Sequence, residues 1–154
     1  MKTWLIAVFT GSLLFIPTAI PESGVREVEA TSCEVIKVNL GLGITTQIVL
    51  EQQPKTTLYA DKSHFKVQSN EGTPRSLAVI PYIQSSEVNT FRKSNGELPS
   101  PEKLANALNE SFRTNLFVFF ENENQLMFEL QFVPKAKADY ILKVRQKFSK
   151  ECSL

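Results

Sequence analysis

The sequence predicts a mostly β protein, folded as a single β-sandwich-like domain with one short helix in an insert. After residue 33, short segments rich in β-branched and aromatic residues alternate with polar turns, as in a sandwich or a partly closed barrel. The 154-residue chain, less an N-terminal leader, is long enough for one hydrophobic core and too short for two. The insert, at about 84–112, interrupts the strand pattern with a polar, loop-like stretch and then a helix.

The N-terminus has the arrangement of an export signal, a basic start followed by an apolar run at residues 4–16. This run is shorter than a membrane-spanning helix requires. Cleavage is predicted after a small residue, either Ala19 or Ala30. We assign residues 1–30 to a signal peptide and 31–154 to the β domain, which is then periplasmic or secreted. Retention of the leader as a membrane anchor is the alternative.

The charges nearly cancel, with 17 lysines and arginines against 16 aspartates and glutamates. A near-neutral chain has no long-range field that would recruit nucleic acid or anionic lipid. We therefore expect no nucleic-acid partner, and contact with a membrane only through an uncleaved leader.

Two cysteines, Cys33 and Cys152, lie at opposite ends of the predicted domain. Because disulfides form and persist outside the cytosol, we predict that the two are bonded to each other. Such a bond would restrict the unfolded chain by up to about 4 to 5 kcal/mol. Two free thiols, or a lipid attached to Cys33, are the alternatives.

Six or seven strands are expected, and the polar turns between the segments contain glycine, proline and asparagine. The segments with strand character are residues 34–40, 44–50, 55–60, 64–68, 76–82, 114–120, 125–133 and 140–148. Pro81 marks the end of its strand or an edge position, since proline cannot donate to a ladder.

The clearest pair of strands is the predicted hairpin formed by residues 114–120 and 125–133. In the second strand, apolar residues at even positions alternate with more polar ones, which indicates one core face and one exposed face. The first strand is apolar on both faces. Two of its residues, Phe117 and Phe119, belong either to a covered core or to a docking surface for another protein.

The helix of the insert is predicted to begin after Ser100, which can cap it, with Pro101 in the first turn. Its apolar residues fall four apart on one face: Leu104, Leu108 and Phe112. This face either covers one end of the sheet or binds in the groove of a partner.

The sequence carries little sign of catalytic or metal chemistry. His64 is the only histidine and the two cysteines are distant, which excludes a multi-histidine metal site and a zinc framework. Asp61, Ser63 and His64 are the residue types of a hydrolytic triad, but near-adjacent side chains entering a strand are expected to diverge. We predict a protein that is not an enzyme and has no cofactor and no metal.

Several segments occur in an order that resembles the N-terminal β domain of the CagX/TrbG family, periplasmic components of the type IV secretion core complex. The resemblance covers about residues 36–145, here as a standalone domain with a longer insert. The residues that carry it are Gly43, Thr45, Thr46, Pro81, Thr114, Asn115 and Leu116. It implies a non-enzymatic scaffold domain that joins an envelope assembly, with other envelope proteins or a second copy of itself as partners. The alternative is a free periplasmic domain that binds a peptide or small ligand between helix and sheet.

Overall fold

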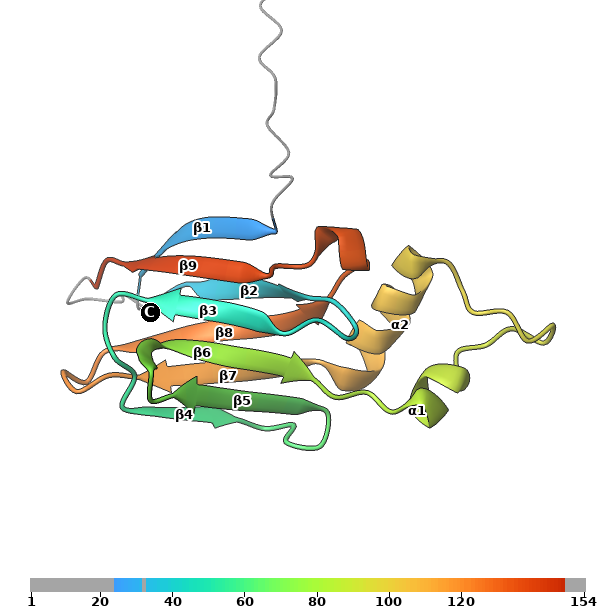
Figure 1. Cartoon of the computed structure of the whole chain (residues 1–154), viewed down its shortest axis with the longest axis horizontal. Coiled ribbons are helices and arrows are strands. Elements are labelled where there is room, and N and C mark those ends of the chain that lie inside the picture. Colours follow the sequence, from blue (N-terminus) through green and yellow to red (C-terminus); the bar gives the residue numbers. More distant parts are fainter. Residues whose placement is uncertain (1–23, 32, 149–154) are drawn as a thin grey trace, which may run out of the picture.

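The computed structural model describes residues 24–31 and 33–148, which form two β-sheets packed face to face (Figure 1). The predicted fold class is confirmed. In chain order the elements are β1 (Val25–Ala30), β2 (Val35–Leu40), β3 (Thr46–Leu50), β4 (Thr56–Tyr59), β5 (Phe65–Asn70), β6 (Thr73–Pro81), α1 (Ser85–Asn89), α2 (Pro101–Phe112), β7 (Thr114–Phe119), β8 (Gln125–Phe132), the 3-10 helix η1 (Lys135–Lys137) and β9 (Ile141–Gln146).

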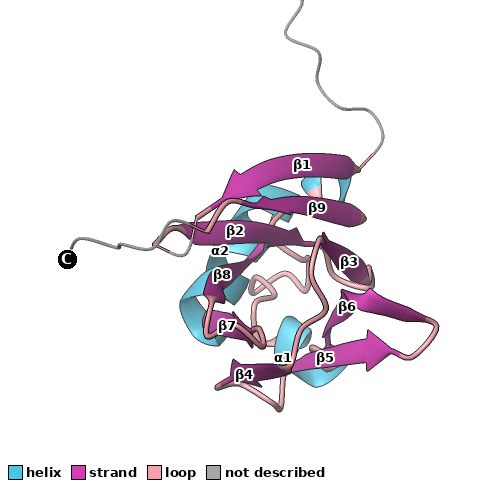
Figure 2. Cartoon of the chain, turned by 90° about the vertical axis from the view of Figure 1, so that its left-hand side faces the viewer, coloured by secondary structure: helices cyan, strands magenta, loops and turns pink. Residues whose placement is uncertain are grey.

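The described residues thus contain nine strands, more than the six or seven expected. The five-stranded sheet has the order β1-β9-β3-β6-β5, and the four-stranded sheet has the order β2-β8-β7-β4. Strand β9 runs parallel to both of its neighbours, and β2 runs parallel to β8, while the other pairs are antiparallel. Seen end-on, β1 lies near β2 at one side of the sandwich and β5 lies near β4 at the other (Figure 2).

The core lies between the two sheets and follows the alternation of each strand. In β8, the four even-numbered residues predicted to face the core are at most 3% exposed: Leu126, Phe128, Leu130 and Phe132. The hairpin of β7 and β8 is confirmed, with Leu116 opposite Phe128. Strand β6 ends at Pro81, as the sequence predicts.

The folded domain begins earlier than the predicted boundary at residue 31. Residues 25–30, assigned above to the signal peptide, form β1 and pair with β9 over their whole length. Cleavage after Ala30 would remove this strand, whereas cleavage after Ala19 would retain it. The leader at residues 4–16 lies outside the described residues, and the signal peptide itself stays a prediction.

Strand β1 was missed because its sequence, VREVEA, contains three charged residues among six. A strand is recognised from sequence by apolar residues on one face, and the inward face of β1 carries a charge at Arg26. That charge is neutralised by Asp139, which is 113 residues away along the chain. No local sequence pattern predicts a pairing between residues so far apart.

The insert contains one helix that the sequence missed and one that it predicted. The short helix α1 lies in the stretch expected to be a loop, and the backbone N–H of Gln84 donates to the Glu87 carboxylate at its start, at 2.8 Å. Helix α2 begins as predicted: its first residue is Pro101, and the Ser100 side chain accepts from the N–H of Lys103. Among the described residues, no helix is long and apolar enough to cross a membrane.

Helix α2 covers one end of the sandwich (Figure 1). Leu108 is 1% exposed, and Leu104 and Phe112 pack against the core while partly buried. The hypothesis that this apolar face binds a partner groove is therefore wrong for Leu108, which a partner could reach only if the helix detached. The burial of this face stabilises the domain instead.

Asn109 of α2 attaches the helix to the end of β8. Its side-chain amide donates to the carbonyl of Phe132 at 2.9 Å and accepts from the N–H of the same residue at 2.5 Å. Asn109→Ala is expected to lower the free energy of unfolding by about 1 to 3 kcal/mol, because two part-buried backbone groups lose their partner. Urea denaturation followed by circular dichroism measures this. Asn106→Ala, at an exposed position of the same helix, is the control, and equal losses would contradict the role of Asn109.

Cys33 lies in the turn between β1 and β2 and is among the described residues. Its predicted partner, Cys152, lies outside them. The disulfide between them therefore stays a prediction.

Candidate functional site

A row of apolar side chains crosses the outer face of the four-stranded sheet. The strand register places Val35 beside Met127, Met127 beside Phe117, and Phe117 beside Leu58. The two ends of the row are well exposed, Val35 at 47% and Leu58 at 57%, and the middle two are partly buried. Because neighbouring strands are about 4.8 Å apart, the row is about 14 Å long. We call these four residues the apolar row.

Phe117 and Phe119, predicted as partner-binding residues, both lie on this outer face. Their rings stack at 6.5 Å between centroids, with 20° between the planes. Both are partly buried, whereas Leu116 and Val118 on the opposite face of β7 are fully buried. Of the five predicted partner-binding residues, these two are on an outer sheet face.

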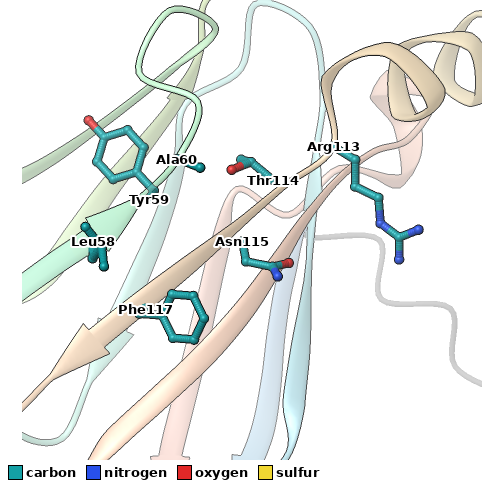
Figure 3. A pocket seen from close by; sticks show the side chains of 7 residues that line it. All are labelled: Leu58, Tyr59, Ala60, Arg113, Thr114, Asn115 and Phe117. Atoms are coloured by element: carbon teal, nitrogen blue, oxygen red, sulfur yellow. The ribbon is translucent and has the colours of Figure 1, made fainter.

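An open pocket of about 540 Å³ lies at the Leu58 end of the row, between the end of β4 and the start of β7. Figure 3 shows Leu58 and Phe117 side by side on neighbouring strands, with Tyr59 turned away from them. The pocket is lined by Leu58, Tyr59, Ala60, Arg113, Thr114, Asn115 and Phe117. The Arg113 guanidinium at its rim is paired with the carboxylate of Glu129. The pocket walls are thus largely apolar, and the rim charge is already neutralised.

The outer face of the five-stranded sheet is different in character. Its surface hollow, about 700 Å³, is lined mainly by glutamine, serine, threonine and asparagine side chains, including Gln47, Gln68 and Ser76. Gln47 donates to the Ser76 hydroxyl at 3.0 Å within this face. An apolar surface that could dock another protein is therefore a property of the four-stranded sheet.

The edge of that sheet at β2 is covered by an ion pair. Arg26 donates to the carbonyl of Lys37 at 2.5 Å, and the Asp139 carboxylate accepts from the N–H of Asn39 at 2.8 Å. The same carboxylate holds Arg26 through two hydrogen bonds, at 2.9 and 2.6 Å. Two backbone groups of β2 that could otherwise hydrogen-bond to an added strand therefore already have partners.

The edge at β4 has no such cover. Within the described residues β4 pairs with β7 alone, and its four residues, TTLY, include no charge, no proline and no bulge. Its link to the neighbouring edge strand is the Tyr59 hydroxyl, which accepts from the N–H of Val67 at 3.3 Å. Uncharged, regular edge strands are the ones that accept a further strand.

A histidine between two carboxylates lies just beyond the end of β4. His64 Nδ1 is 2.9 Å from both carboxylate oxygens of Asp61, and Nε2 is 2.8 Å from Oε1 of Glu87. The imidazole ring also packs on Phe112, the last residue of α2, with centroids 4.4 Å apart. We call Asp61, His64 and Glu87 the histidine clasp. It connects the β4–β5 turn to both helices of the insert.

The expectation that Asp61 and His64 diverge is wrong. The chain turns tightly after β4, and the Asp61 carboxylate accepts from the N–H groups of Ser63 and His64, which turns the imidazole back toward it. Glu87 reaches the other ring nitrogen from α1, 23 residues away, a contact that no local pattern signals. Locally, Glu87 is the third residue of α1, where its carboxylate accepts from the N–H of the N-cap residue Gln84.

The clasp does not have the geometry of a hydrolytic site. A catalytic histidine held by aspartate through Nδ1 needs Nε2 next to a nucleophile, and here Nε2 is held by Glu87. The two carboxylates also lie at opposite ends of the ring, so they cannot ligate one metal together with it. The arrangement suits a structural contact whose strength depends on protonation.

Protonation of His64 favours the clasp, because imidazolium donates from both nitrogens, one to each carboxylate. Burial of the ring lowers its pKa, but the hydrogen bonds to Glu87 and Asp61 outweigh this, and the pKa of His64 is raised. The pKa of Glu87 is lowered by the backbone N–H of Gln84 and then by His64.

We predict that the free energy of unfolding falls as pH rises through the raised pKa of His64. A raised native pKa gives stability that is fully present below the unfolded value, about 6.5, and is lost above the native one. The lowered pKa of Glu87 acts in the opposite direction and removes stability only at acidic pH. Urea denaturation between pH 5.5 and 9 measures the slope. In His64→Gln the slope should be absent, and an unchanged slope would contradict the assignment.

Comparison with protein-family models gave no match, and comparison with curated proteins gave none either.

Proposed function

We propose that this chain is an exported, non-enzymatic domain that works by binding other proteins of the cell envelope. The observation that carries the proposal is the contrast between the two edges of the four-stranded sheet. At one edge Arg26 and Asp139 are hydrogen-bonded to the backbone of β2, and at the other β4 is uncharged and exposes its own Leu58. A strand added at β4 would gain backbone hydrogen bonds and contact with the apolar row at the same time.

The resemblance to the CagX/TrbG β domain supports an envelope location and a scaffold role. Two residues that carry it, Thr114 and Leu116, begin β7 and are buried, so they act in folding rather than in contact with partners. The assembly could then be a type IV secretion-like complex, joined through the β4 edge.

Ligand binding between helix and sheet is the second candidate function. A pocket of about 270 Å³ lies between α2 and the loops near Leu42 and Val133. Small-molecule sites are usually about 300 to 1,000 Å³ and contain a few convergent polar groups. Lys135 is the one charged residue of this pocket's lining. The pocket therefore favours the protein-binding function over ligand capture.

The test is a crosslinked pull-down of the tagged full-length protein from its native envelope, with mass spectrometry of what co-purifies. Leu58→Lys places a charge beside the β4 edge and should abolish recovery of partners. Leu98→Lys, at a leucine 41% exposed in the insert, is the matched control and should leave recovery unchanged. Recovery of the wild-type chain as a lone monomer, or equal recovery with Leu58→Lys, would contradict the proposal.

A further inference from the structure

Among the four edge strands of the sandwich, β4 is the one that the described part of the chain leaves without protection. Strand β1 carries Glu27 and Glu29, which pair with Arg145 of β9 and with Lys147 just after it. Strand β5 has an irregular register between Ser69 and Asn70, and its Val67 N–H is bonded to Tyr59. Strand β2 is covered by the Arg26–Asp139 pair. Charges, bulges and covered backbone all discourage pairing between chains, and β4 has none of them.

The sequence around β4 is complementary to itself in one antiparallel register. With Leu58 on the two-fold axis, Leu58 lies opposite Leu58 of the second copy, Thr57 opposite Tyr59, and Lys55 opposite Asp61. Opposed residues then share a face. Lys55 and Asp61 flank β4 and already have partners in their own chain, Glu121 and His64, so the pairing rests on the four residues of β4. A two-fold interface requires this kind of self-complementarity, since the same patch serves both copies.

This register also continues the apolar row. Leu58 ends the row of one copy and would adjoin Leu58 of the other, so that the two rows form one stripe across eight strands. Thr56 of the second copy would lie opposite Ala60, at the mouth of the pocket beside Phe117. Pairing would therefore cover the two most open features of this face, the Leu58 side chain and the pocket.

We propose that two copies of this chain pair antiparallel through β4, centred on Leu58, and join their four-stranded sheets. The pairing rests on the proposed function, because it assigns the partner of the same edge. It requires no rearrangement of β4, whose four residues are uncharged and pair with β7 in a regular register.

The test is sedimentation velocity of the chain from residue 20 onward, over a wide concentration range up to high micromolar. The wild-type chain should form a dimer that dissociates on dilution. Leu58→Lys should be monomeric, because it opposes two like charges on the axis. Leu98→Lys should behave as wild type, and circular dichroism checks that both variants are folded.

Crosslinking tests the register. Leu58→Cys should form a covalent dimer under mild oxidation, because this residue faces its own copy across the axis, and Thr56→Cys should not. A wild-type chain that stays monomeric at all concentrations, or a dimer unaffected by Leu58→Lys, would overturn the pairing. If the wild-type chain is monomeric but Leu58→Lys still abolishes envelope capture, self-pairing fails while the proposed function stands. If the wild-type chain dimerises through Leu58 but recovers no other protein from the envelope, self-pairing is supported and the proposal of envelope partners is contradicted.

Discussion

Asp139→Ala is expected to lower the free energy of unfolding by about 3 kcal/mol, because removing one partner of a buried ion pair leaves the other charge without a counter-ion. The Asp139 side chain is 5% exposed and accepts three hydrogen bonds, two from Arg26 and one from the N–H of Asn39. Arg26 is 31% exposed, and water can therefore replace part of the loss, which places the effect at the lower end of the usual range. Urea denaturation at neutral pH measures it.

Glu29→Ala is the matched control for that experiment. It also removes an ion pair of β1, with Lys147, but these side chains are 60% and 65% exposed. Exposed pairs contribute little to stability, because water screens the two charges, so a much smaller loss is expected. Similar losses for Asp139→Ala and Glu29→Ala would show that the Arg26–Asp139 pair is not the contact that holds the two sheets together at this side.

A chain that begins at Thr31 is expected to be destabilised even more, by about 5 kcal/mol or more, and to be largely unfolded if its total stability is ordinary. It lacks β1, which pairs with β9 over six residues, and it lacks Ala30, which is fully buried in the core. It also lacks Arg26, so the Asp139 carboxylate is left buried without its cation. Thermal unfolding compared with a chain that begins at Ile20 measures the difference.

This prediction extends to the exported protein. If a leader is removed, cleavage should occur upstream of Val25, and the intact mass of the protein recovered from the envelope should include β1. A mature protein that begins at Thr31 and is as stable as the longer chain would contradict the place of β1 in the fold.

The sequence by itself determined most of the regular elements. Strand β8 has one apolar residue at every second position, and the start of α2 has a serine cap followed by proline. These signals are local: a period of two marks a face of a strand, and a capping side chain satisfies N–H groups within its own first turn. In β7, alternation places Phe117 and Phe119 on the same face, and the structure shows that this face is the outer one.

Three features depend on tertiary structure: the N-terminal boundary of the folded domain, the histidine clasp, and the protection of the sheet edges. Arg26 became an inward residue of a strand only because Asp139 arrives from 113 residues away, and His64 became a clasp only because α1 brings Glu87 to its second nitrogen. Leu108 had the same apolar character as Phe117, but α2 turned it into the core while β7 turned Phe117 outward. Which side chains are buried, and which charges pair, depends on which elements far apart in the sequence come into contact. The periodicity and capping signals of a single segment carry no information about those contacts.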